Sequence, residues 1–396
     1  MKEIIVNNAK DKSTIIVTQD GNLIEKYEEF DDLERLEGNI YLGKVVDILP
    51  GMQATFVDIG DNKNAFLHIK DILPKVSNQT GNKNEDLNKY NIKDYVKTGM
   101  PVIVEVKKDK TDKKGAKVST NLNIAGKFVV IIPNSDFITI SHKIEDKKEI
   151  ERLNNTVKDS QINGYGIIIR TSAINASEEQ IKEDIHDVIK IYENIKNKAD
   201  EIIKNKGNIP DLLYEKGNII KRLLLDIGHQ ELDKVIVNNE QTYEFVKGIL
   251  KEIHLNVKVE LIKRDNILDI YNLEKQIEKI SNRKVWLNCG GFITIDQTEA
   301  LTAIDVNSGK FTGKESIEKT VLKVNAEATI EIAKQIRARD IGGIVIIDYI
   351  DMDKKEDEEY IQNLLLEHLK KDRAKTQVVG FTKLHLLEMT RKHICS

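Results

Sequence analysis

The stretch ALTAIDVNSG, residues 300–309, begins as an apolar strand and then places an aspartate and an asparagine where further aliphatic residues would continue the pattern. Side chains alternate across a strand, so residues 301, 303, 305 and 307 share one face. Asp305 and Asn307 are therefore neighbours on that face, at the end of the strand. Because a buried, unpaired carboxylate is costly, we expect the pair to meet water, a partner or a cation.

A second carboxylate, Asp348, interrupts the apolar run IVIIDYIDM (344–352) in the same way. Between the two runs, apolar residues recur at helical spacing over 316–340, and the pair Gly342–Gly343 is expected to end that helix. The hairpin 292–307, this helix and the strand 344–350 are close enough in sequence to form one sheet with one crossover. The pattern thus predicts two carboxylates at neighbouring strand ends.

Two such carboxylates could bind a hard divalent cation. Mg²⁺ keeps several waters and commonly uses one or two carboxylates, and Asn307 could orient one of those waters. The metal would activate water and neutralise charge growing on a phosphodiester. The alternative is that strand-end aspartates cap the next helix, which we expect of Asp351 and Asp353 before KKEDEEYIQNLLLEHL (354–369).

Composition narrows the class of protein. The chain has 396 residues, of which 40% are hydrophobic, and this length predicts roughly two or three domains. No run of about 18 apolar residues and no secretory signal is present, so we expect a cytoplasmic protein without a membrane span. The only cysteines, Cys289 and Cys395, form neither a disulfide framework nor a CxxC pair. A formal charge of -4 means that any RNA binding must come from local patches.

Several further elements can be placed from the pattern. STIIVTQDGNLIEKYEEF (13–30) predicts a hairpin that turns at Asp20–Gly21. The segment 38–72 has turn signals at Pro50–Gly51 and Gly60–Asp61, which is typical of a small antiparallel barrel that closes near residue 125. Residues 75–98 are a polar excursion. From residue 177 the spacing predicts a helix with one apolar stripe, consisting of Ile181, Ile185, Val188, Tyr192 and Ile195.

Several motifs resemble the ribonuclease E/G family, bacterial endoribonucleases of RNA processing (rRNA processing included) and decay. The resemblance is carried in order along nearly the whole chain by GNIYLGKV (38–45), ATFVDIG (54–60), AFLHIKDI (65–72), KKGAKVST (113–120), AGKFVVIIPN (125–134), GYGIIIRTSA (164–173), EALTAIDVNSG (299–309), NAEATIEIAKQIRARDIGGIVIIDYIDM (325–352), DRAKTQ (372–377) and LLEMTRK (386–392).

This resemblance implies an α+β multidomain architecture. An RNase H-like subdomain would be split between 1–34 and 216–280. An S1-like OB RNA-binding domain (35–125) and a 5′-sensor region (126–215) would be inserted into it. A DNase I-like catalytic subdomain (281–396) would follow.

The resemblance also assigns roles to residues. Asp305 and Asp348 would be the Mg²⁺ ligands, with Asn307 supporting the hydration of the metal. Three positions match RNA-contacting residues of the family: Phe56, Phe66 and Lys114. Five match its pocket for a 5′-monophosphate: Gly126, Val130, Arg170, Thr171 and Lys375.

Each of these roles has an alternative in the residues themselves. Both phenylalanines would be core residues in a generic barrel, because Phe is more often buried than exposed, whereas exposed aromatics could stack on unpaired bases. An arginine that ends an apolar strand is usually solvated, although a guanidinium beside a hydroxyl suits a phosphate dianion. Lys375 stands where the family often has arginine, and His142–Lys143 replace an Arg-Arg pair, so we expect a modest 5′ preference.

The expected function is therefore Mg²⁺-dependent endonucleolytic cleavage of single-stranded RNA, with preference for 5′-monophosphorylated substrates. Metal-activated water would leave a 5′-phosphate and a 3′-hydroxyl, as the resemblance implies. The rival classes are a non-catalytic RNA-binding protein that has kept the nuclease fold and a DNA nuclease. Family members usually continue past the last motif into a CxxC zinc link between protomers, so we expect a monomer or weak dimer here, with His393 and Cys395 as the alternative zinc ligands.

Overall fold

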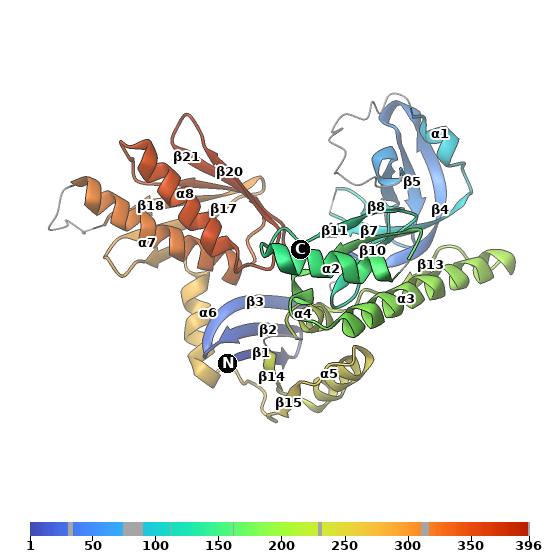
Figure 1. Ribbon diagram of the computed structural model, residues 1–396, viewed down its shortest axis with the longest axis horizontal. Coiled ribbons are helices and arrows are strands. Elements are labelled where there is room, and N and C mark those ends of the chain that lie inside the picture. Colours follow the sequence, from blue (N-terminus) through green and yellow to red (C-terminus); the bar gives the residue numbers. More distant parts are fainter. Residues whose placement is uncertain are drawn as a thin grey trace. The chain divides into compact units, whose positions relative to one another are not determined.

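The computed structural model describes residues 1–30, 35–73, 90–111, 113–160, 162–228, 232–309 and 317–394. The chain divides into two compact units (Figure 1). Unit 1 consists of Met1–Leu33 together with Glu231–Ser396, and unit 2 is Glu34–Gln230, so that residues 216–230 group with unit 2. Both units mix helices and strands, as expected for an α+β protein. No helix in the described ranges is long and apolar enough to cross a membrane.

The first sheet of unit 1 has the order β15–β14–β1–β2–β3. Strands β14 and β15 run parallel to β1, whereas β1, β2 and β3 form an antiparallel meander. Asp20 and Gly21 join β2 to β3 with φ values of 51° and 76°, which confirms the predicted tight turn. The elements are β1 (Lys2–Ala9), β2 (Lys12–Gln19), β3 (Asn22–Phe30), β14 (Leu232–Val237), α5 (Glu240–Glu252), β15 (Lys258–Leu261), η5 (Ile270–Asn272) and α6 (Leu273–Ser281).

The second sheet of unit 1 has the order β16–β17–β18–β19–β21–β20. Strand β18 runs parallel to β19 and is joined to it through α7, which confirms the predicted single crossover. The elements are β16 (Lys284–Trp286), β17 (Phe292–Gln297), β18 (Leu301–Asn307), α7 (Ile317–Ala338), β19 (Gly343–Asp348), α8 (Lys355–Leu369), β20 (Thr376–Phe381) and β21 (Leu386–Arg391).

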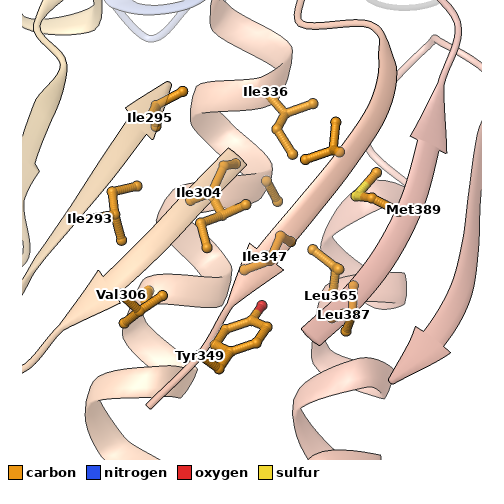
Figure 2. Close-up of a cluster of buried hydrophobic side chains, with 14 of the residues drawn as sticks. Ile293, Ile295, Ile304, Val306, Ile336, Ile347, Tyr349, Leu365, Leu387 and Met389 are labelled. Carbon is orange, nitrogen blue, oxygen red and sulfur yellow. The ribbon is translucent and has the colours of Figure 1, made fainter. Parts of the chain in front are cut away.

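The core of this sheet lies on one face only. Aliphatic side chains of the inner strands pack against α7 and α8, as Figure 2 shows for Ile304, Ile347 and Leu365. Along β18, buried residues alternate with exposed ones. We call the face that points away from α7 and α8 the open face. Strand β19 also contributes to this face, because Ile344 is 48% exposed.

Two predicted helix boundaries are wrong. Helix α7 ends at Ala338, and Asp340 takes the left-handed conformation, with φ 49°, before the chain reaches Gly343 with φ 87°. The Ile341 N–H donates to the Ile336 carbonyl at 3.0 Å, which closes the helix end. Helix α8 begins at Lys355 after Lys354 as N-cap, with no side-chain capping bond. Asp351 and Asp353 therefore lie outside the capping position.

Unit 2 contains a closed barrel of five strands in the order β4–β5–β6–β8–β7, because β7 pairs back with β4. The predicted barrel is thus present, but it is not wholly antiparallel, since β6 and β8 run parallel. Its last strand ends at Ser119, a few residues before the predicted end near residue 125. The elements are β4 (Ile40–Leu49), η1 (Pro50–Met52), β5 (Ala54–Asp58), β6 (Ala65–His68), η2 (Ile69–Asp71), α1 (Ile92–Tyr95), β7 (Pro101–Lys108), β8 (Lys117–Ser119) and β13 (Asp211–Tyr214), which also pairs with β4. Most of the polar excursion lies outside the described residues.

A second sheet of unit 2 has the order β11–β12–β10–β9 and packs against α2 and α3. Helix α3 starts with a capping box between Ser177 and Gln180, and its predicted stripe is buried apart from the half-buried Tyr192. The elements are β9 (Ile124–Ala125), β10 (Val129–Pro133), β11 (Ile138–Ile140), α2 (Lys147–Asp159), β12 (Tyr165–Ile169), η4 (Thr171–Ala173), α3 (Glu178–Lys204) and α4 (Ile219–Ile227).

Candidate functional site

Asp305 and Asp348 are direct neighbours on the open face of unit 1. Their Cα atoms are paired in the parallel ladder between β18 and β19. Thr302, Ile304 and Val306 point into the core, so the alternation of β18 turns Asp305 outward. Both aspartates are exposed. The local apolar pattern thus places two carboxylates about one strand spacing, roughly 4.8 Å, apart.

Asn307 adds an amide to this pair. Its Nδ2 donates a hydrogen bond of 2.5 Å to Oδ2 of Asp305. The bond fixes the orientation of the Asp305 carboxylate and leaves the Asn307 Oδ1 atom available as an acceptor. Two carboxylates and a neutral amide oxygen form a hard, all-oxygen set.

The electrostatics of the pair favour a cation. Burial raises the pKa of the Asp348 carboxyl, and the nearby carboxylates of Asp305 and Asp351 raise it further. This repulsion is what a bound divalent cation would offset. Among the described residues, no group of three or more His, Cys, Asp or Glu side chains gathers to hold a metal. The two carboxylates and the amide oxygen suit a hard divalent cation that takes few protein ligands and retains water.

A buried amide on α7 positions the backbone that follows Asp348. Asn325 is fully buried, donates from Nδ2 to the Ile350 carbonyl at 2.8 Å and accepts from the Ile350 N–H at 3.1 Å. The adjacent Tyr349 hydroxyl lies 3.0 Å from Thr329 Oγ1. These bonds tie the end of β19 to the helix. The signal was visible in the sequence as two polar residues, four apart, within the apolar stripe of α7.

Phe56 and Phe66 face each other on the outside of the barrel of unit 2. They are paired across β5 and β6, and their ring centroids are 6.1 Å apart in an edge-to-face arrangement. Both are half-buried, and neither belongs to the barrel core, which is filled by alternate residues such as Val57 and Leu67. The His68 ring follows on the same face, 6.4 Å from that of Phe66. The rings thus form an aromatic surface that could stack on bases.

Lys114 lies in the loop before β8. The loop turns through a hydrogen bond of 2.8 Å from the Thr111 N–H to the Lys114 carbonyl. A Cβ atom on Gly115 would approach the Asn64 carbonyl oxygen to 2.1 Å, so only glycine lets this loop pack against the loop before β6. Lys114 is exposed. The loop that carries Lys114 therefore packs against the loop that leads into β6, the strand of Phe66.

Four of the five predicted 5′-phosphate residues lie together in the second sheet of unit 2. The Arg170 N–H donates to the Phe128 carbonyl at 2.8 Å, and its guanidinium donates to the Gly126 carbonyl. Val130 is half-exposed on β10, between β9 and β12. Thr171 Oγ1 lies 3.1 Å from Ser141 Oγ. These four predicted residues thus supply a guanidinium and one hydroxyl, and Ser141, which was not predicted, adds a second hydroxyl.

Two acidic residues that the sequence did not single out shape this pocket. Asp184 of α3 is buried and accepts the N–H groups of Lys127, Phe128 and Val129 at 2.7–3.0 Å. A Cβ atom on Gly126 would lie 2.5 Å from its Oδ1, so this position requires glycine.

The second acidic residue, Asp226 of α4, forms an ion pair with Arg170. A phosphate would have to compete with this carboxylate for the guanidinium. The fifth predicted residue, Lys375, is exposed in unit 1 and is not in the same unit as Arg170. His142 is exposed on the loop after β11.

Comparison with known proteins identifies the family. The model of the "Ribonuclease E/G family" matches residues 123–394. Ribonuclease G of Escherichia coli (strain K12) is 35% identical over 393 residues, which cover 98% of this chain and 79% of the relative. The chain belongs to the ribonuclease E/G family.

Other members of the family match over the whole length of the chain. Ribonuclease G of Haemophilus influenzae is 34% identical over 98% of this chain and 79% of its own length. Ribonuclease E of Buchnera aphidicola subsp. Schizaphis graminum is 32% identical over 100% of this chain and 41% of its own length. The ribonuclease E/G match thus includes both the strands of the aspartate pair and the second sheet of unit 2.

Proposed function

We propose that this chain, an endoribonuclease of the ribonuclease E/G family, cleaves single-stranded RNA at the site formed by Asp305 and Asp348, with Mg²⁺ as cofactor. The observation that carries the proposal is the register of β18 and β19, which sets the two exposed carboxylates side by side with Asn307 beside them. A non-catalytic RNA-binding protein would have no use for two adjacent, mutually repelling carboxylates.

The residues of the site would have different roles. Asp305 and Asp348 would hold the metal, and Asn307, which holds the Asp305 carboxylate in place, would support the hydration of the metal. When bound, Mg²⁺ supplies an activated water and offsets charge on the phosphodiester. Attack by water on phosphorus leaves a 5′-phosphate and a 3′-hydroxyl.

The remaining clusters would hold the RNA. Phe56 and Phe66 would stack on unpaired bases, at about 1–3 kcal/mol per base, and Lys114 would pair with the backbone. Base stacking requires unpaired nucleotides, so it selects single-stranded substrate.

The cluster of Gly126, Val130, Arg170 and Thr171 would bind a 5′-monophosphate, and the role of Lys375, which belongs to unit 1, stays a prediction from the resemblance. Because Asp226 competes for the Arg170 guanidinium, the preference for 5′-monophosphorylated RNA should be modest.

One experiment tests both the reaction and the 5′ preference. The 5′-monophosphorylated and 5′-hydroxyl forms of one AU-rich RNA are incubated with the protein, with Mg²⁺ and with EDTA. We expect cleavage of both forms with Mg²⁺ only, and faster cleavage of the monophosphorylated form. A matched deoxyoligonucleotide should remain intact. RNA that is bound but uncut under every condition would support the non-catalytic alternative.

A further inference from the structure

An exposed aromatic pair lies on the open face of unit 1, apart from the barrel. Trp286 of β16 and Phe292 of β17 are directly opposite in the ladder, and their ring centroids are 5.3 Å apart at 62°. Trp286 is 60% exposed although it is the largest side chain of the sheet and the only tryptophan of the chain. The pair does not contribute to the core that α7 and α8 cover.

The strand register continues this pair into the aspartate site. Phe292 is paired with Asn307, and the next row of the same face runs from Lys284 through Thr294 and Asp305 to Asp348. Adjacent strands lie about 4.8 Å apart, so Phe292 is one strand spacing from Asn307 and Trp286 is two. The aromatic pair therefore borders the place where the scissile phosphate must lie.

A lysine completes the cluster. The Lys284 Nζ atom lies 3.6 Å from the ring centroid of Phe292 and 4.0 Å from that of Trp286. No carboxylate of the described residues lies within ion-pair distance of Lys284. Its ammonium group is held by the two rings, an interaction of modest strength at an exposed site. The charge is thus available to a phosphate, and the exposed side of the Trp286 ring is available to a base.

We propose that Trp286 and Phe292 stack an unpaired base of the substrate RNA next to the scissile phosphate, while Lys284 pairs with the flanking phosphate. This inference rests on the proposed cleavage site and adds a second base-binding position, on unit 1. The occupant is a nucleotide of single-stranded RNA, because a planar base with an adjacent anion matches an exposed aromatic pair beside an ammonium group that has no carboxylate partner among the described residues. The subsite aligns the strand over the aspartates.

Tryptophan fluorescence tests the contact without requiring cleavage. The Asp305→Asn variant is titrated with a short single-stranded RNA, while the anisotropy of a label on the RNA reports binding. Because Trp286 is the only tryptophan, its emission should be quenched with the same saturation curve as the anisotropy. RNA binding with unchanged tryptophan emission would overturn the proposal.

An abasic scan tests the role in cleavage. One RNA is prepared with a single abasic nucleotide at each position around its cleavage site. We expect one position near the cut at which base removal lowers kcat/KM of the wild type about tenfold and has no further effect on Trp286→Ala. On intact RNA, kcat/KM of Trp286→Ala should fall by the same factor, and Trp286→Phe should retain most of the activity.

Tyr360→Ala is the matched control, because Tyr360 is an exposed aromatic (51%) on α8, away from the open face. It should cleave as the wild type does. If Trp286→Ala cleaves as fast as the wild type and no position distinguishes the two, the subsite is wrong and the proposed function stands. If the wild type cleaves nothing, the proposed function is wrong, and the fluorescence titration still decides whether a base contacts Trp286.

Discussion

Asp305 and Asp348 are adjacent, and the proposed cleavage depends on both carboxylates. Substituting either one should therefore affect cleavage and not RNA binding. Asp305→Asn or Asp348→Asn should abolish cleavage, because either change removes a charge that the metal needs. RNA affinity should persist, since most of it comes from phosphate and stacking contacts elsewhere. Cleavage of a labelled RNA and its binding by anisotropy check the two effects separately.

Asp296 provides the control for these substitutions. It lies on the same open face, in an exposed ion pair with Arg283. Asp296→Asn should leave turnover close to that of the wild type. Normal turnover in Asp305→Asn would contradict the assignment of the metal ligands.

The outward position of Phe56 and Phe66 leads to a second prediction. Phe56→Ala or Phe66→Ala should weaken RNA binding by about 1–3 kcal/mol and leave the melting temperature nearly unchanged, because neither ring fills the barrel core. Val57→Ala, at a fully buried neighbour, should lower the melting temperature and leave RNA binding nearly unchanged. A large loss of thermal stability with intact RNA binding would restore the core interpretation of the two phenylalanines.

Arg170 tests the 5′-phosphate pocket. Arg170→Ala should erase the rate advantage of monophosphorylated RNA and leave cleavage of 5′-hydroxyl RNA nearly unchanged, because in the proposed complex the terminal phosphate is the part of the RNA that the guanidinium contacts. Rates on both substrates check this. Conversely, Asp226→Asn should increase the advantage, since it removes the competing carboxylate. Equal losses on both substrates in Arg170→Ala would indicate a structural role.

Among the elements of unit 1, β3 is tied to α7 and to the segment after α8 by one buried carboxylate. Glu25 is 1% exposed and accepts from Arg337 and Arg373 at 2.7 Å each. Burial alone would raise the pKa of Glu25, but Arg373 and Arg337 outweigh it and lower the pKa to about 2. A lowered pKa contributes stability that is present above the ordinary value of 4.5 and is lost as the pH falls towards 2.

Glu25→Gln should therefore destabilise the protein by about 3–5 kcal/mol at pH 7, because it removes the buried carboxylate that accepts from the half-buried Arg337 and Arg373. The difference from the wild type should shrink between pH 4.5 and pH 2. Urea unfolding of both proteins at several pH values measures this. A difference that does not depend on pH would exclude the charge as its cause.

The sequence predicted those elements whose signals are local. The turn at Asp20–Gly21 and the outward alternation of Asp305 follow from backbone preference and strand period, and the structure has both. The end of α7 was missed because Asp340, in the left-handed conformation, closes the helix before the glycine pair. The aromatic pair of Trp286 and Phe292 was also missed, because an aromatic in an alternating strand looks the same whichever face is covered.

At the scale of the whole molecule, local pattern could not supply the long-range pairings. Strand β1 pairs in parallel with β14, although all of unit 2, residues 34–230, lies between them in the sequence. The discontinuous first domain was expected only because the motifs resemble those of a known family. Likewise, the pocket around Arg170 depends on Asp184 and Asp226, which come from helices that lie far along the chain.

The division into two units predicts that RNA binding and cleavage can be separated physically. Residues 34–230 hold a closed barrel and a second sheet, each with its own buried core. Expressed alone, this segment should fold cooperatively and bind single-stranded RNA, and Phe66→Ala should weaken that binding. It should cleave nothing, because Asp305 and Asp348 belong to unit 1. Thermal unfolding, anisotropy and a cleavage assay with Mg²⁺ test the three parts, and cleavage by the isolated segment would place the catalytic site elsewhere.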